Sequence, residues 1–201
     1  MTLQNRVGPD GAIVAVRERG LLMGNRGGRL HDAERRLGRR RWAGHSWISC
    51  RLEFRGRRRQ VMAPHAYTEL FFLDDLVALA AGHRPCGTCR RSELAAFRRH
   101  WPQTLAELGA IDRSLHAART APRPLLPLAD IADGAFVRWP EASPHLVWRG
   151  ALRPFAFGGY GAPVAMQEAP PEVEVLTPAP VLVVLTQGYR PTVLHPSLEH
   201  G

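Results

Sequence analysis

Short apolar runs separated by turn residues dominate the first seventy positions and predict strands there. Leu3–Val7 and Ala12–Val16 flank the turn sequence GPDG at positions 8–11, so the chain is expected to open with a β-hairpin. Trp47–Phe54 predicts a further strand, and so does Tyr67–Phe72. This half of the chain is therefore expected to be built around short strands.

Helical spacing begins at about position 74. Asp74 can cap a helix that runs to Ala81, and Gly82 suits its end because glycine readily adopts the left-handed backbone of a helix stop. Three further helices are predicted. The first is Glu93–Trp101, capped by Ser92. The second is capped by Thr104, runs to about Arg119 and buries Leu105, Leu108, Ile111 and Leu115. The third is Pro178–Gln187, capped by Thr177 and stopped by Gly188.

The most distinctive local motif is the Cys-x-x-Cys pair formed by Cys86 and Cys89. Two thiolates on one tight turn can bind a single tetrahedral ion, and zinc is the usual ion in a reducing compartment. Pro85 restrains the backbone before the turn, and Gly87 lets backbone N–H groups approach the sulfurs. The alternatives are two unrelated thiols or a redox pair, which is typically preceded by a strand, whereas a helix is predicted before this motif.

A structural zinc site needs two further ligands. Cys50 is the only other cysteine, and its predicted strand can present it to the Cys-x-x-Cys turn; the alternative is a small buried core residue. The fourth ligand is expected to be a histidine. His31 is the first candidate, followed by His45 and then His65.

The region of about residues 67–91 resembles the second half of the zinc-binding domain of the bacterial DNA-repair protein family Ada. The shared features are the Phe71–Phe72 pair, the helix ending in A-L-A-A-G, and the R-P-C-x-x-C sequence that ends at Cys89. The resemblance implies a strand, a short helix and a knuckle that supplies two zinc ligands, with two more ligands from an upstream hairpin. It also implies contact with DNA.

The upstream half departs from the Ada pattern. That family carries Cys-x-x-x-Cys there, and related modules carry His-x-x-x-Cys. In this chain Cys50 lies 36 residues before Cys86, and His45 is spaced H-x(4)-C from Cys50. The fourth ligand is therefore left open between the histidines.

Charge is distributed unevenly along the chain. All 27 basic residues are arginine; residues 1–100 hold 20 of them against 9 acids, a net charge of +11, and residues 101–201 hold 7 against 9, a net of −2. A phosphate backbone is a partner that suits arginine, and the alternative is a merely soluble surface in an arginine-rich proteome. The expected nucleic-acid contacts are Arg35, Arg36, Arg39, Arg40, Arg41, Arg57, Arg58 and Arg59.

Two further motifs allow either a chemical or a structural interpretation. Asp112, His116 and Arg119 fall on one stripe of a predicted helix. The stripe can be a general acid–base site, or it can be an exposed face with pairs that stabilise the helix. The glycine-rich segment 24–32, which contains His31, is expected to form no regular element. It can serve as a phosphate-approaching loop or as a flexible turn.

These elements predict an α+β fold, with a small zinc-stapled hairpin and helix module, two trailing helices and a short-stranded C-terminal part. Strands are expected there at Ala135–Trp139, Leu146–Trp148 and Val173–Leu176. Three prolines mark residues 121–134 as a connector between a domain at 1–120 and a region at 135–201.

Three functions stay open. The first is a zinc-binding protein that contacts nucleic acid, with DNA favoured. The second is an enzyme acting on nucleic acid, a nuclease or repair activity that uses His31 or the Asp112, His116 and Arg119 stripe. The third is an interaction module for an acidic protein. The first residues show no secretory signal, no run approaches the ~18 apolar residues of a membrane span, and the odd cysteine number argues against disulfides, so a cytoplasmic location is expected.

Overall fold

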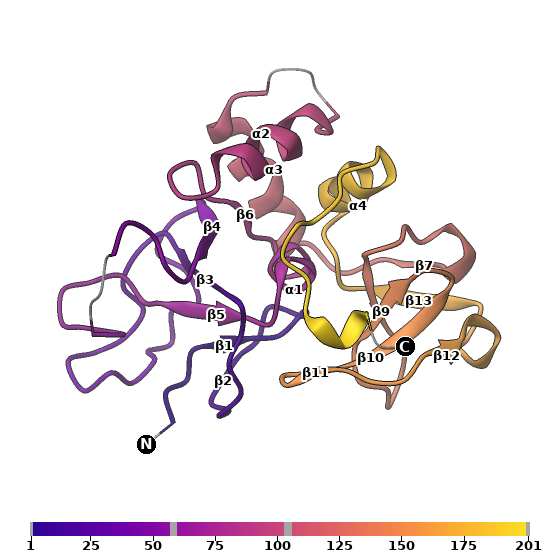
Figure 1. Ribbon diagram of the computed structural model, residues 1–201, viewed down its shortest axis with the longest axis horizontal. Coiled ribbons are helices and arrows are strands. Elements are labelled where there is room, and N and C mark those ends of the chain that lie inside the picture. Colours follow the sequence, from indigo (N-terminus) through magenta and orange to yellow (C-terminus); the bar gives the residue numbers. More distant parts are fainter. Residues whose placement is uncertain (1, 57–59, 103–105, 200–201) are drawn as a thin grey trace.

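The computed structural model describes residues 2–56, 60–102 and 106–199. Figure 1 shows two β-sheets, one built from the N-terminal part of the chain and one from the C-terminal part, with α1 between them. The predicted α+β class is confirmed in this general form. Within the described ranges, no helix is long and apolar enough to cross a membrane.

The N-terminal sheet has, in the described part of the chain, the strand order β2-β1-β5-β3-β4-β6. Its strands are β1 (Arg6–Val7), β2 (Ile13–Val14), β3 (Leu22–Arg26), β4 (Trp47–Arg51), β5 (Leu70–Phe72) and β6 (Arg84–Pro85). Strands β1 and β2 pair antiparallel around a turn in which Gly11 N–H donates to Gly8 O at 2.9 Å. The predicted opening hairpin is therefore confirmed.

The C-terminal sheet follows the order β11-β10-β9-β8-β13-β7, with β12 paired to β10. Its strands are β7 (Leu125–Pro127), β8 (Phe136–Arg138), β9 (His145–Trp148), β10 (Ala151–Ala156), β11 (Gly159–Tyr160), β12 (Val164–Ala165) and β13 (Glu172–Val175). Every pairing in it is antiparallel. The segment predicted as a connector contributes β7, which pairs with β13, and the strands β10 to β12 were not predicted.

Four α-helices lie in the described ranges: α1 (Asp75–Ala80), α2 (Arg91–Arg99), α3 (Leu108–Thr120) and α4 (Ala179–Thr186). Short 3-10 turns occur at Leu128–Asp130, Met166–Glu168 and Pro196–Leu198. Helix α1 is buried along its whole length. As predicted, it is capped by Asp74, whose side chain accepts the Val77 N–H at 3.0 Å, and it ends before Gly82, which has φ of +79°.

Two predicted helix caps are wrong. Ser92 lies inside α2 and its hydroxyl donates to Glu93 rather than capping the helix. Thr177 precedes α4, but its hydroxyl accepts the Phe136 N–H at 2.8 Å and so fastens the helix to β8. Thr104 and Leu105 lie outside the described residues.

The glycine-rich segment was expected to lack regular structure, but its first residues form the end of β3. A Cβ on Gly24 would lie 2.1 Å from the Ile48 carbonyl oxygen of β4, so only glycine lets the two strands approach this closely. The neighbouring strand, rather than a local turn, therefore explains this glycine.

Buried apolar side chains form two clusters, and each combines residues from before and after position 121. One joins Leu22 and Phe72 of the N-terminal sheet to Phe136 and Leu146 of the C-terminal sheet. The other packs α2, α3 and α4 against β8, β9, β10 and β13. The core thus crosses the predicted boundary near residue 121, and the division into domains stays a prediction.

Candidate metal centre

Strand pairing brings Cys50 and Cys86 to the same place. Strand β6 lies parallel to β4, with Ser49 opposite Pro85. The Cys86 N–H then donates to the Ser49 carbonyl oxygen at 2.9 Å and extends the pairing by one residue. Because Cys50 and Cys86 each follow this pair in register, their side chains meet at the edge of the sheet.

A tight turn returns Cys89 to the same point. The Arg90 N–H donates to the Cys86 carbonyl oxygen at 3.1 Å, and α2 starts immediately afterwards. The Thr88 N–H donates to the Cys86 sulfur at 3.3 Å, as the sequence of the turn predicted. The three sulfur atoms lie within 4.8 Å of one another.

The cluster could hold a metal ion. A tetrahedral zinc with Zn–S bonds of ~2.3 Å places its sulfurs about 3.8 Å apart, and the three sulfurs here, within 4.8 Å of one another, exceed that spacing by about 1 Å at most. The predicted meeting of Cys50 with Cys86 and Cys89 is confirmed. In the described part of the chain, no histidine, aspartate, glutamate or further cysteine joins the group.

The three thiols differ in how readily they ionise. A hydrogen bond from the Cys50 thiol, aided by the backbone N–H groups of Cys89 and Thr88, lowers the pKa of Cys86 to about 4. The same hydrogen bond, together with burial, raises the pKa of Cys50. Burial also raises the pKa of Cys89. Cys86 is therefore the thiol that loses its proton at the lowest pH, and a bound cation would favour ionisation of the other two thiols.

His31 lies elsewhere. It is buried, with Nδ1 2.6 Å from the Thr68 hydroxyl and Nε2 3.2 Å from the Ala63 carbonyl oxygen. Both ring nitrogens thus have protein partners, and the side chain fastens the segment after β3 to the one before β5. The geometry does not support His31 as the fourth ligand.

The other two candidate histidines are also outside the cluster. The His45 ring stacks on His116 of α3, with 4.0 Å between ring centroids, and His65 is exposed. Neither belongs to the group of ligand atoms around the cysteines.

The predicted stripe on α3 is engaged in contacts within the protein. The Asp112 carboxylate receives two hydrogen bonds from Arg84, at 2.7 and 2.8 Å. The Arg119 guanidinium donates to the carbonyl oxygens of Gly82 and His45, at 2.7 and 2.6 Å. Asp112 and Arg119 therefore tie α3 to the N-terminal sheet, while His116 stacks on His45.

Two buried arginines beside the cysteines were not predicted as site residues. Arg84 pairs with Asp112, and Arg90 is fully buried against the Asp75 carboxylate at 2.5 and 2.7 Å. Arg90 also donates to the Ser49 hydroxyl of β4 at 3.0 Å. Both arginines flank the Cys-x-x-Cys motif in the sequence, and this position could have identified them as site residues.

Most of the predicted nucleic-acid contacts lie on the long connection between β3 and β4. Arg35, Arg36, Arg39, Arg40 and Arg41 are all exposed there. Arg36 pairs with Asp32 and Glu34, so its charge is partly balanced. Arg57, Arg58 and Arg59 lie outside the described residues.

Comparison of the chain with protein-family models, with curated proteins and with solved structures finds no match in any of the three.

Proposed function

We propose that Cys50, Cys86 and Cys89 bind one zinc ion, and that the zinc-stabilised basic half of the protein contacts nucleic acid, with DNA preferred. The observation that carries the proposal is the convergence of the three sulfurs from a strand and a turn that are 36 residues apart. A shared ion explains why side chains so far apart in sequence meet at one point. Zinc is favoured because it binds thiolates tetrahedrally and needs no redox partner.

The surroundings of the cluster suit a structural ion. The Thr88 N–H already points at the Cys86 sulfur, and hydrogen bonds of this kind orient thiolate ligands. With three protein donors, the fourth would come from solvent or from another molecule. The strand β5, the short helix α1 and the following turn occur in the order that the Ada resemblance implies.

The nucleic-acid part of the proposal rests on the exposed arginines between β3 and β4. Within the described residues, Arg35, Arg39, Arg40 and Arg41 form no ion pair. Guanidinium groups of this kind release counterions when they meet phosphates, so binding should weaken steeply as salt rises.

Native mass spectrometry tests the metal. Wild-type protein should carry one zinc ion per chain, and Cys86→Ser should lose it together with much of the folding free energy. His31→Gln is the matched control and should keep the ion.

A wild type that is metal-free, equally stable in chelator and able to form a reversible Cys86–Cys89 disulfide would instead establish a redox pair. A redox pair is typically preceded by a strand, and the two-residue strand β6 lies between α1 and Cys86, where the sequence predicted only the helix.

Binding to a generic DNA duplex at several salt concentrations tests the partner. The double variant Arg39→Gln/Arg40→Gln should reduce the slope of log affinity against log salt by about 2. The control, Arg113→Gln/Arg149→Gln, removes the same charge from exposed positions outside the basic half. Equal losses in the two double variants, or no binding by the wild type, would contradict the proposal.

A further inference from the structure

A pocket of about 740 Å³ lies where the two sheets meet. Its wall is formed by residues of β2, β3 and β4, by the ends of α1 and α3, and by the segments 121–124 and 175–179. Four arginines line it, Arg26, Arg41, Arg119 and Arg123, against one acidic residue, Asp10. The volume is in the usual range for a small-molecule site.

Arg26 is the most buried of these arginines. Its side chain is 2% exposed, and its guanidinium donates to the Gly11 carbonyl oxygen at 2.9 Å and, more weakly, to the Arg41 carbonyl oxygen at 3.4 Å. Its Nε lies 3.4 Å from Nε2 of His83. No carboxylate of the described residues is within ion-pair distance of Arg26.

The guanidinium groups of Arg26 and Arg119 both pack on the Trp47 ring. The Arg26 and Arg119 Cζ atoms lie 4.0 and 3.9 Å from the Trp47 ring centroid. Burial, followed by the repulsion from Arg119 and Arg41, lowers the pKa of Arg26 to about 9, and burial lowers the pKa of Arg119 to about 10. Two positive charges are thus held close together in a partly water-free place, at a cost in free energy that a bound anion would relieve.

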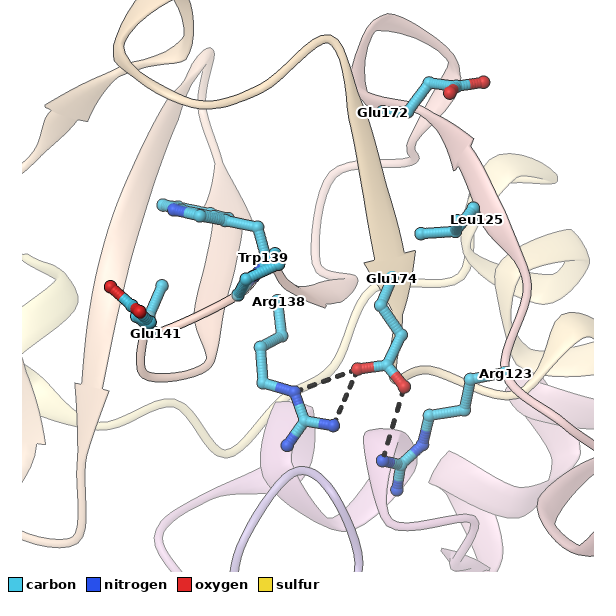
Figure 2. A pocket seen from close by; sticks show the side chains of 9 residues that line it. Arg123, Leu125, Arg138, Trp139, Glu141, Glu172 and Glu174 are labelled. Atoms are coloured by element: carbon cyan, nitrogen blue, oxygen red, sulfur yellow. Dashed lines mark hydrogen bonds and ion pairs between the residues drawn. The ribbon is translucent and has the colours of Figure 1, made fainter.

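A pocket in the C-terminal part of the molecule shows the contrast. Figure 2 shows the Glu174 carboxylate between Arg138, which it meets at 2.7 Å, and Arg123, which lies at 4.0 Å. That pocket supplies its own negative charge. Of the four arginines around the larger pocket, only Arg123 has a carboxylate partner in the described residues.

The larger pocket also offers an aromatic surface. Trp42 lines it and is 41% exposed, which is unusual for so large an apolar side chain. It follows Arg41 directly, so a ring stacked on Trp42 would lie close to arginine side chains. Exposed tryptophan beside arginine is a combination that stacks nucleobases and holds phosphate.

We propose that this pocket binds a nucleotide, with its phosphate on Arg26, Arg119 and Arg41 and its base against Trp42. The nucleotide can be a free nucleoside phosphate or the terminal, phosphorylated nucleotide of a single strand. This goes beyond the proposed function, which rests on the exposed arginines and on duplex binding and does not require the pocket.

Tryptophan fluorescence and isothermal titration calorimetry on the full chain test the proposal, with four probes at fixed ionic strength. Adenosine 5′-monophosphate should bind at least about tenfold more tightly than inorganic phosphate, and adenosine should bind more weakly than either. The fourth probe is a short single strand, with and without a 5′-phosphate. Tighter binding of the phosphorylated strand than of the free nucleotide identifies a strand end as the ligand, and equal or weaker binding identifies the free nucleotide.

Variants locate the binding. Arg26→Gln should weaken adenosine 5′-monophosphate binding at least about tenfold. If that variant does not fold, Arg41→Gln supplies the same test from an exposed position, with a loss of several-fold. Arg40→Gln is the matched control, because it is the exposed neighbour of Arg41 and does not line the pocket.

The proposal is overturned if neither adenosine 5′-monophosphate nor the phosphorylated strand saturates the protein in the millimolar range. It is overturned equally if inorganic phosphate binds as tightly as the nucleotide, or if Arg40→Gln and Arg41→Gln weaken nucleotide binding alike. Salt-dependent duplex binding that survives any of these results would leave the proposed function standing.

Discussion

The cysteine cluster and the arginine pocket both hold buried charge, and they treat it differently. Beside the cysteines, Arg84 and Arg90 each meet an aspartate in a two-bonded ion pair. In the pocket, Arg26 and Arg119 meet carbonyl oxygens and the Trp47 ring, with no carboxylate of the described residues in ion-pair range. The chain thus supplies carboxylates to Arg84 and Arg90, whereas Arg26 and Arg119 have none in the described residues.

This difference indicates the charge of the ligand that each region can bind. At the cluster each arginine has a carboxylate partner, whereas the Cys86 thiolate is held only by hydrogen bonds from the Cys50 thiol and from backbone N–H groups, so a cation fits there. In the pocket Arg26, Arg41 and Arg119 have no carboxylate partner in the described residues, so an anion fits there. Four predictions test this distinction, beginning with the largest expected effect.

Arg90→Met should lower the free energy of unfolding by about 3–5 kcal/mol, because it leaves the Asp75 carboxylate buried without its cation. Urea unfolding followed by circular dichroism measures the change. Asp75 also accepts the backbone N–H groups of Thr192 and Val193, so the loss should reach the C-terminal segment as well. A cost below about 1 kcal/mol would show that Arg90 is not a structural charge.

Stability should fall as the pH is lowered below 6.5, because burial and the nearby Arg26 and Arg119 keep the pKa of His83 well below its ordinary value. The ring stays neutral in the folded protein, packed against Trp47 and Phe72, while the unfolded chain takes up a proton. The unfolded state then binds more protons, so stability declines by at most about 1.4 kcal/mol per pH unit.

Unfolding curves at pH 7 and pH 5 measure this decline. His83→Gln should reduce it, whereas the same change at the exposed His65 should not. The raised pKa of Asp74, about 6 because of burial, acts in the opposite direction between pH 6 and 3.8, so the wild type must be compared with the variant at each pH. Identical pH profiles for His83→Gln and wild type would contradict the account of His83.

Arg26→Met should cost only about 1 kcal/mol or less in the absence of ligand, in contrast to Arg90→Met. Removal of an unbalanced buried charge offsets the loss of its carbonyl hydrogen bonds and its contact with Trp47. The same urea titration measures it. A loss as large as that of Arg90→Met would mean that Arg26 is a structural residue and would remove the distinction between the two regions.

Glu174→Gln should change stability least, by about 0.5 kcal/mol, since its partners Arg123 and Arg138 are about one-third exposed and solvent screens the pair. Thermal unfolding at low and high salt measures the effect. A cost of several kcal/mol, independent of salt, would place this pair with Arg90 and Asp75.

Local signals explain which elements the sequence predicts. The GPDG turn, the Asp74 cap, the Gly82 stop and the Cys-x-x-Cys turn each depend on a few neighbouring residues, and the structure contains all of them. Cys50 could be added because it was the last remaining cysteine. The Ada resemblance and the domain boundaries stay predictions.

Long-range contacts explain what was missed. Gly24 is required by the Ile48 carbonyl of a strand more than twenty residues away, and His31 has hydrogen-bond partners that no spacing rule reveals. The pocket collects side chains from Asp10 to Ala179, so its excess of arginine is invisible in any short window. Arg26 stood in a segment that the sequence marked as a possible phosphate loop, but a strand, and not a loop, positions it.

X-ray absorption at the zinc edge of purified protein tests the metal centre most directly. Three sulfur neighbours at about 2.3 Å and one lighter neighbour are expected, because a single chain supplies only three thiolates. Zinc surrounded by nitrogen and oxygen alone, or by four sulfurs shared between two chains, would contradict a centre built from Cys50, Cys86 and Cys89 of one molecule.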